Sequence, residues 1–326
     1  MKVFIIGGTG FLGYYSALEL LQRGHEVATV SLPDIALGDW FPDQVAVEYG
    51  NVFEMSDVQL RELLAGYDAV VYAVGPDDRV KPKGDAYTFF HERLVLACGR
   101  VVAAARKAGV KRCVVLGSYF AYFDRVWQEQ RLAAHHPYIR CRIEQAERVI
   151  REGGGKMDVM VLELPYIFGT MPERTPLWKD ILVTMLMNSR IVFFPKGGTN
   201  MISVRHVGEA VAGAIETGQH GQRYTIGDVN MTWKQMLRMM LEGLGIGNKR
   251  IISLPCFLMN STAKSMKKKE IAEGIQSGLD PLYLFRDIQC RQMWYDPTPS
   301  AKALGYGRGG IETAIDETMK ACLKDV

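Results

Sequence analysis

Short apolar runs alternate with segments of helical periodicity through the first half of the chain. A short apolar run without polar interruption is typical of a strand buried on both faces. We therefore expect strands at Val3–Ile6, Val27–Val30, Val45–Val47, Ala69–Val74, Val114–Leu116 and Val159–Leu162.

Helices are predicted between these runs. Apolar residues recur at helical spacing from Phe11 onward, and Gly24 suits the end of that helix. The segment Ser56-Asp57-Val58-Gln59 is a capping box that opens a second helix. Longer helices are expected over Tyr87–Ala108 and from Pro137 to the glycines Gly153-Gly154-Gly155. This alternation predicts an α/β fold with a doubly wound parallel sheet, built from right-handed βαβ units.

A glycine-rich segment lies between the first predicted strand and the first predicted helix. Gly7–Gly13 has the pattern G-x-x-G-x-x-G. Small residues let the backbone turn tightly and approach a pyrophosphate, and the helix N-terminus offers free N–H groups and a positive dipole end. The position of the pattern between a strand and a helix predicts a Rossmann-type dinucleotide site.

The end of the second strand usually holds the residue that reads the adenosine ribose. An acidic residue there favours NAD, and a nearby arginine favours NADP. Here the strand ends in Ser31, which carries no charge, no arginine follows, and Asp34 lies farther along the chain. The sequence therefore leaves both NAD and NADP open as the cofactor.

The alternation loosens after Pro165. Leu177–Met187 and Val207–Ile215 keep helical spacing, whereas Ile191–Phe194 reads as extended chain. We predict a dinucleotide-binding Rossmann domain over residues 1–168. Residues 169–326 should form mainly a smaller substrate-binding lobe, with segments around 191–227 returning to the sheet.

Composition narrows the class of protein. The 326 residues are 48% hydrophobic and 23% charged, which is ordinary for a globular protein with a full core. The net charge of +3 is too small to indicate nucleic acid or an anionic membrane as a partner. No stretch approaches the apolar length of a membrane span. We expect a small molecule as the partner.

The cysteines and the N-terminus indicate a compartment. The six cysteines are scattered without a C-x-x-C pair, so we interpret them as reduced structural thiols and expect no metal site. The opening Met1–Gly13 lacks the long apolar region and cleavage site of a signal peptide. These observations predict a cytoplasmic protein.

With the glycine loop in hand, the chain resembles the extended short-chain dehydrogenase/reductases over nearly its whole length. The resemblance is to the NAD-dependent epimerase/dehydratase family and its dihydroflavonol-reductase-like group. Gly50-Asn51-Val52, Val70–Val74 and Leu162–Tyr166 are similar to segments that line the family's coenzyme. Asp296–Tyr306 is similar to its C-terminal Asp…Lys…Leu-Gly-Tyr signature. The resemblance implies these coenzyme-binding residues: Gly7, Thr9, Gly10, Phe11, Leu12, Gly13, Ser31, Asn51, Val52, Ala73, Val74 and Pro165.

The family's chemistry uses a Tyr, a Lys four residues later and an upstream Ser or Thr. The resemblance assigns these positions to Tyr138, Arg142 and Ser118. A spacing of four places both side chains on one helix face, where the cation should lower the pKa of the tyrosine. Arg142 keeps the charge but cannot relay a proton as an ammonium can. The alternative is that Tyr138 is an ordinary helix residue and Arg142 a surface charge.

Other candidates near these positions receive less weight. Tyr119 and Tyr122 are rival proton donors that we interpret as pocket or core residues. His135 and His136 are interpreted as loop residues, because adjacent side chains point in different directions.

The substrate class follows from a missing arginine. Nucleotide-sugar members of the family carry an Arg where Thr199-Asn200 stands, and an Asp where His206 stands. These departures favour a smaller carbonyl or alcohol substrate, with Arg205 either an anion ligand or half of an ion pair.

Two functions remain open. The first is an NAD(P)-dependent oxidoreductase or epimerase/dehydratase for a small carbonyl, alcohol or sugar-like substrate, with Tyr138 as the general acid/base. The second is a weakly active or inactive NAD(P)-binding redox sensor or scaffold. The resemblance also implies a possible homodimer.

Overall fold

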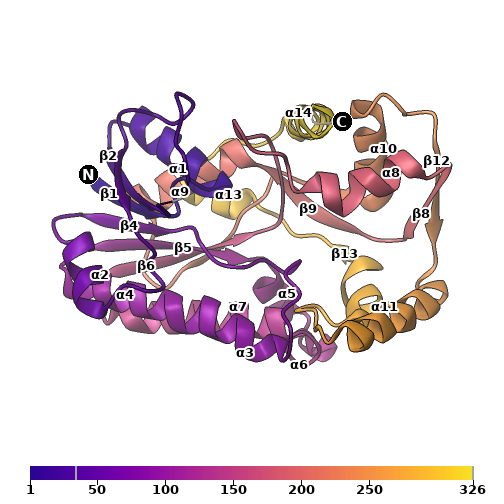
Figure 1. Ribbon diagram of the computed structural model, residues 1–326, viewed down its shortest axis with the longest axis horizontal. Coiled ribbons are helices and arrows are strands. Elements are labelled where there is room, and N and C mark those ends of the chain that lie inside the picture. The colour runs from indigo at the N-terminus through magenta and orange to yellow at the C-terminus, as the bar shows by residue number, and fades with distance from the viewer. Residues whose placement is uncertain (34, 325–326) are drawn as a thin grey trace.

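The computed structural model describes residues 1–33 and 35–324, so Asp34 lies outside the described residues. Within these ranges the main sheet has seven strands, all parallel, in the order β10-β6-β5-β4-β1-β2-β3 (Figure 1). The strands are β1 (Lys2–Ile6), β2 (Glu26–Ser31), β3 (Ala46–Tyr49), β4 (Ala69–Tyr72), β5 (Arg112–Ser118), β6 (Asp158–Leu164) and β10 (Arg223–Thr225). This confirms the predicted parallel α/β fold. Strand order reverses between β1 and β4, where doubly wound sheets bind ligands.

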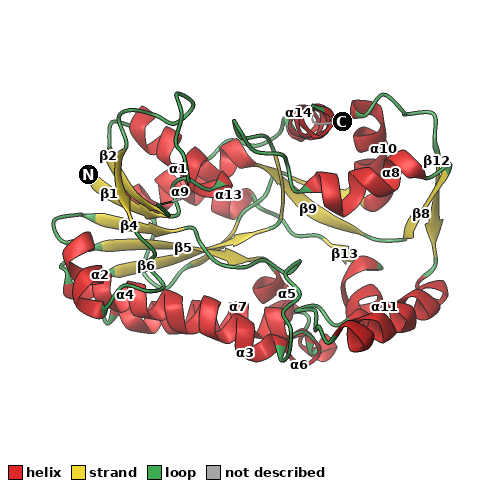
Figure 2. Cartoon of the chain, in the orientation of Figure 1, coloured by secondary structure: helices red, strands yellow, loops and turns green. Residues whose placement is uncertain are grey.

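Helices cover both faces of the main sheet (Figure 2). One face carries α1 (Phe11–Gln22), α9 (Val204–Thr217) and α13 (Thr298–Leu304), and the other carries α2 (Asp57–Leu64), α4 (Ala97–Lys107) and α7 (Pro137–Gly153). Val3 and Ile5 pack into the first core, while Phe4 and Ile6 pack into the second. Burial on both faces explains why the strands are continuously apolar.

The helix predicted over Tyr87–Ala108 spans almost that range in three pieces. It consists of α3 (Ala86–Phe90), a π-helical segment η1 (His91–Leu96) and α4. Asp85 starts it, because its side chain accepts a hydrogen bond from the Thr88 N–H. The π-helical segment was not predicted, since no periodicity marks one extra residue per turn.

Short helices that the sequence analysis did not predict connect β5 to α7. These are α5 (Phe120–Val126), η2 (Gln128–Gln130) and α6 (Leu132–His135). Of these, α5 and α6 pack with α3 and α7 around an aromatic core that includes Phe90, Phe120 and Tyr138. This core also receives Met293 and Tyr295 from late in the chain, so it joins the sheet domain to the C-terminal residues.

The later chain builds a smaller part around its own core (Figure 1). Two small sheets lie here: β11-β9-β13 with β7 paired to β9, and β12-β8. Their strands are β7 (Tyr166–Phe168), β8 (Ile191–Pro195), β9 (Gly198–Ser203), β11 (Val229–Thr232), β12 (Arg250–Leu254) and β13 (Gln292–Met293). The helices are η3 (Lys179–Val183), α8 (Thr184–Asn188), α10 (Trp233–Gly243), η4 (Cys256–Met259), α11 (Asn260–Glu273), α12 (Pro281–Leu284), η5 (Phe285–Gln289) and α14 (Ile311–Leu323).

The segment around residues 191–227 divides between the two parts. Its strand β10 pairs with β6 in the main sheet and its helix α9 packs against α1, whereas β8 and β9 lie in the small sheets. We propose residues 1–168 as the dinucleotide-binding unit and residues 169–326 as mainly the substrate lobe. Among the described residues, no helix has the length and apolar character that crossing a membrane requires.

Candidate active site

The turn between β1 and α1 depends on its glycines. Gly7 adopts a φ of +91°, a region that favours glycine. A Cβ on Gly13 would overlap the carbonyl oxygen of Gly7. Gly10 caps α1 without a side-chain hydrogen bond, so the helix that Phe11 and Leu12 begin presents its first N–H groups without a side-chain acceptor. This backbone cradle fits the phosphates of a dinucleotide.

Residues from β2 and from the chain after β4 converge on this loop. The Thr9 and Ser31 hydroxyl oxygens lie 3.3 Å apart, and Ser31 is buried. A Cβ on Gly7 would lie 3.0 Å from the carbonyl oxygen of Ala73 and would overlap the side chain of Val74. Ser31, Ala73 and Val74 therefore lie beside the glycine loop that contains Thr9. The contacts of these four residues with a coenzyme stay a proposal.

The remaining predicted coenzyme residues lie at two other strand ends. The Asn51 amide nitrogen donates to Glu54 Oε1 at 2.8 Å, and its oxygen accepts from the Phe53 N–H at 3.1 Å. Asn51 is thus hydrogen-bonded within its own loop. Val52 is buried beneath it, and Pro165 directly follows β6.

Tyr138 and Arg142 lie one turn apart on α7 and touch. Arg142 Nε donates a hydrogen bond to Tyr138 Oη at 2.9 Å. The two residues are only 3% and 9% exposed. Helix α7 begins at Pro137, whose fixed φ suits a first helical position. The structure therefore brings the predicted pair together in a buried setting, which excludes Arg142 as a surface charge.

Other contacts of Arg142 connect the pair to the sheet. Arg142 Nη1 donates to the Leu116 carbonyl at 3.3 Å and to Gln145 Oε1 at 2.9 Å. Leu116 lies on β5 two residues before Ser118, whose Oγ accepts from the Phe120 N–H at 3.4 Å. Among the described residues, no acceptor takes the second terminal nitrogen of Arg142, Nη2. That nitrogen is available to a ligand.

The electrostatics of Tyr138 differ from the expectation. Burial raises the pKa of Tyr138 to about 12, although the charge and hydrogen bond of Arg142 act in the opposite direction. Desolvation of the phenolate therefore outweighs the nearby cation. The phenol is protonated at neutral pH, which makes it a proton donor rather than a ready base.

The rival tyrosines have other contacts. Tyr119 is buried, and its hydroxyl lies 2.8 Å from Thr199 Oγ1. The Tyr122 ring packs 5.6 Å from the ring of Tyr295. Both are packing residues in this structure, so Tyr138 is the better placed proton donor.

A charged turn after β4 joins this site, and the sequence analysis did not single it out. Asp77 Oδ1 accepts hydrogen bonds from the backbone and Nε of Arg79, each at 2.9 Å. Burial, followed by the charge of Asp77, raises the pKa of Asp78 to about 6. After burial, Asp78 is the largest influence that raises the pKa of Tyr166, and it also raises that of Tyr138. The run of charged residues Asp77–Arg79, which follows β4 after Gly75 and Pro76, was the signal that could have found this turn.

Aromatic side chains line the far side of the site. The Tyr166 ring on β7 lies 5.3 Å from Trp233 and 5.8 Å from Trp178, and Trp178 stacks on Phe168 at 4.4 Å. These residues come from the later part of the chain. Tyr166 and Phe168 end the proposed dinucleotide-binding unit, whereas Trp178 and Trp233 lie in the proposed substrate lobe.

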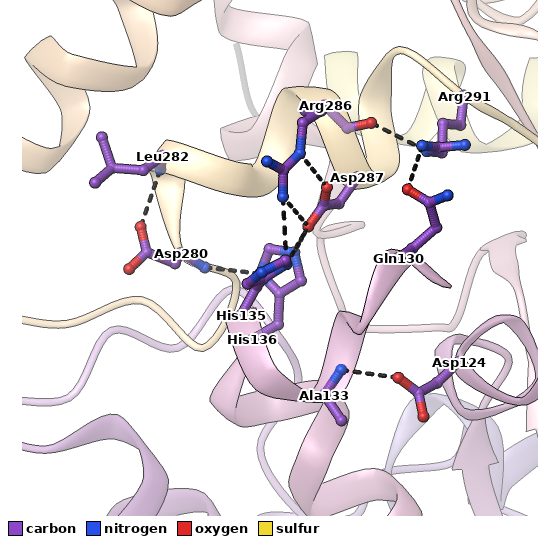
Figure 3. A network of polar contacts seen from close by, with 10 residues as sticks. All are labelled: Asp124, Gln130, Ala133, His135, His136, Asp280, Leu282, Arg286, Asp287 and Arg291. Carbon is purple, nitrogen blue, oxygen red and sulfur yellow. Dashed lines mark hydrogen bonds and ion pairs between the residues drawn. The ribbon is translucent and has the colours of Figure 1, made fainter. Parts of the chain in front are cut away.

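The structure corrects the interpretation of the adjacent histidines. His135 ends α6 and His136 precedes α7, yet both approach Asp287 (Figure 3). His135 Nδ1 lies 2.7 Å and His136 Nε2 lies 3.6 Å from Asp287 Oδ2. The extended backbone of His136 at the junction of the two helices turns both rings toward one carboxylate.

Asp287 is the centre of this network. It is fully buried, and Arg286 Nε donates to its Oδ1 at 2.7 Å. Burial acts to raise the pKa of Asp287, but the nearby His136 ring and the hydrogen-bonded Arg286 and His135 outweigh it and hold the pKa well below its usual range. His136 Nδ1 also accepts from the Asp280 N–H at 3.0 Å. The network fastens η5 to the start of α7.

The region that grips a pyrophosphate in nucleotide-sugar enzymes has different residues here. Thr199 is buried against Tyr119. The Arg205 guanidinium is exposed and lies 3.8 Å from Glu317, and His206 Nδ1 lies 2.8 Å from Asp228 Oδ1. Arg205 is thus half of an ion pair.

Comparisons with known proteins agree with this geometry. Residues 7–168 match the family model described as NAD(P)H-binding. The mouse sterol-4-alpha-carboxylate 3-dehydrogenase (decarboxylating) is 26% identical over 67% of this chain. Residues 7–168 therefore form an NAD(P)H-binding domain, and the relatives of this chain are extended short-chain dehydrogenase/reductases. An NAD(P)-binding domain is part of this family, so NAD or NADP is the cofactor.

Further comparisons give the coverage of these relatives and a similar solved structure. The match to the mouse protein spans 59% of that protein's length. A UDP-glucose 4-epimerase of Klebsiella pneumoniae is 28% identical over 38% of this chain and 94% of its own. The crystal structure of the Bordetella bronchiseptica enzyme WbmH with NAD+ has a TM-score of 0.71 at 17% identity, covering 100% of this chain and 99% of the other. That last likeness shows the fold.

Proposed function

We propose that the protein is an NAD(P)-dependent reductase that converts a small carbonyl compound or a sugar-like ketone to the alcohol. The observation that carries this proposal is the buried contact between Arg142 Nε and Tyr138 Oη at 2.9 Å. It lies at the carboxyl edge of the sheet, the edge that carries the glycine loop. A phenol whose pKa is about 12 suits the donation of a proton to a developing alkoxide.

The chain's own residues would divide the work as follows. The Ser118 hydroxyl would hold the substrate oxygen, and Tyr138 Oη would donate its proton to that oxygen. Arg142 would stabilise the phenolate that remains, because its Nε–H already points at Oη. When bound, the reduced dinucleotide supplies the hydride. The free Arg142 Nη2 would take a hydroxyl of the coenzyme or the substrate.

Charge balance supports a neutral substrate. Asp77 and Asp78 supply two negative charges near Tyr138, and Arg79 and Arg142 supply two positive ones. Among the described residues that shift the pKa of Tyr138, the positive charges do not outnumber the negative ones. An anionic substrate, such as a carboxylate or a phosphate, would therefore gain little electrostatic attraction there. Reduction and epimerisation of a neutral carbonyl or sugar-like compound both fit this balance.

Replacement of Tyr138 by Phe tests the proposal. We expect Y138F to lower turnover of a carbonyl substrate by at least about a hundredfold, because the proton donor is lost. The dissociation constant for NADH or NADPH should stay close to that of the wild type, as measured by coenzyme fluorescence. Tyr122→Phe is the matched control and should keep wild-type turnover. Equal turnover in Y138F and the wild type would contradict the assigned role.

A second candidate is a redox sensor that binds the coenzyme without turnover. The observation that favours it is the tethering of Arg142 to Leu116 and Gln145, beside a phenol of raised pKa. A partner interaction that follows the NAD(P)H/NAD(P)+ ratio, together with no activity on a broad carbonyl and alcohol panel, would support it. Robust turnover on that panel would eliminate it.

A further inference from the structure

The turn after β7 reaches back to the glycine loop. Residues Met171 and Arg174 form an isolated bridge across this turn, and Glu173 between them has a φ of +54°. Tyr15 of α1 donates a hydrogen bond from its hydroxyl to the Thr170 carbonyl at 2.7 Å. The turn is therefore tied to the same helix whose N-terminus faces the phosphates.

This geometry places Arg174 beside the loop. Arg174 Nη1 lies 4.0 Å from the point that a Cβ of Gly10 would occupy. The side chain is exposed and lines a groove of about 1250 Å³ that runs between α1, α9 and α14. Among residues 1–33 and 35–324, no hydrogen bond or ion pair engages its guanidinium. An unpaired cation thus lies next to the expected position of two phosphates.

A second arginine in the same groove has a different role. Arg205 also lines the groove, but its guanidinium lies 3.8 Å from Glu317.

Backbone strain before Arg174 also supports a functional role for this turn. A non-glycine residue at positive φ is costly, and such residues cluster where a segment must hold a functional position. Glu173 adopts this conformation directly before Arg174.

We propose that Arg174 is a phosphate clamp, a residue of the substrate lobe that binds the pyrophosphate of the dinucleotide across the glycine loop. A guanidinium can bond two phosphate oxygens at once, and Arg174 lies beside Gly10, the residue that caps α1. The coenzyme would then be held by both parts of the molecule. The inference rests on coenzyme binding at the loop and does not depend on the chemistry of Tyr138.

Binding measurements on the full chain test this clamp. Titrations with NADH and with ADP-ribose should give dissociation constants at least about tenfold higher for Arg174→Ala than for the wild type. Arg174→Lys should fall between them, since it keeps the charge but loses the paired geometry. Arg205→Ala is the matched control from the same groove and should bind like the wild type. Melting temperatures without ligand should agree among all four proteins, because both arginines are exposed.

The salt dependence of binding gives an independent readout. The affinity of the wild type for ADP-ribose should fall more steeply with ionic strength than that of Arg174→Ala, because one charge contact is missing in the variant. Equal dissociation constants and equal salt dependence in the two proteins would overturn the clamp and leave the proposed reductase intact. Failure of the wild type to bind NADH, NADPH or ADP-ribose would overturn both.

Discussion

Two buried polar clusters flank the first turn of α7, and they are completed to different degrees. Just before the helix, both oxygens of Asp287 are occupied by His135 and Arg286, with His136 nearby. Just inside the helix, Arg142 bonds Tyr138 but has no carboxylate partner among the described residues, and its Nη2 has no acceptor there.

The difference separates a structural cluster from a candidate catalytic one. A buried group whose hydrogen bonds are all made within the protein has little left to offer a ligand. Arg142 is bonded only to neutral groups, and its Nη2 keeps a hydrogen-bond donor available to a ligand. By this criterion the Asp287 carboxylate joins η5 to the start of α7, and the Tyr138–Arg142 pair is the one we propose to act on a substrate.

Removal of Asp287 should give the largest effect on folding. Asp287→Ala leaves His135 and Arg286 without their shared buried acceptor, so we expect the free energy of unfolding to fall by about 1.5–3 kcal/mol. Urea denaturation measures this change. Asp316→Ala, which loses an exposed pair with Lys320, is the control and should cost less than about 1 kcal/mol.

The dependence of the free energy of unfolding on acidic pH tests the role of Asp287 independently. Because the pKa of Asp287 is lowered in the folded state, its contribution is present above the ordinary carboxyl pKa and is lost as the pH falls below it. The gap in stability between wild type and Asp287→Ala should therefore narrow as the solution becomes acidic. A gap that stays constant across this range would contradict the charge-based account.

Arg142 should show the opposite balance between stability and activity. Arg142→Met removes a buried cation that lacks a carboxylate, so the free energy of unfolding should change little. Reductive turnover should fall by about tenfold to a hundredfold, because the phenolate left after proton donation loses a charged hydrogen bond. Arg142→Lys should retain more turnover. Steady-state kinetics measures the change in turnover, and urea midpoints measure the change in stability. A large loss of stability with normal turnover would show that Arg142 is structural and would contradict its proposed role.

Asp78 should have the smallest effect and should act on the pH profile. Above about pH 6 its carboxyl is ionised and raises the pKa of Tyr138. Asp78→Asn removes that charge, so the alkaline fall in reductive kcat/KM should move to lower pH by about half a unit to one unit. Below pH 6 the two profiles should converge. An alkaline limb that does not move would exclude electrostatic coupling between the two residues.

The sequence predicted features whose determinants are close together along the chain. The glycine spacing identifies the loop because Gly7, Gly10 and Gly13 act through their own backbone. The spacing of Tyr138 and Arg142 follows from one helical turn. The pKa of Tyr138 was expected to fall, but burial, which depends on the whole fold, raises it.

Features that depend on distant segments escaped the sequence analysis. The two histidines were interpreted as loop residues because adjacent side chains point in different directions, and their shared contact, Asp287, lies about 150 positions later. Arg174 lies beside Gly10 only because β7 leads the chain back over α1. No local pattern marks either contact, and both require the packing of the two parts.

The fastening of η5 to the start of α7 has a consequence for Tyr138. Because the joint at Asp287 immediately precedes the first turn of α7, a segment from late in the chain fixes where that turn begins. We therefore expect a change at Asp287 to reach the position of the tyrosine as well as the stability of the fold.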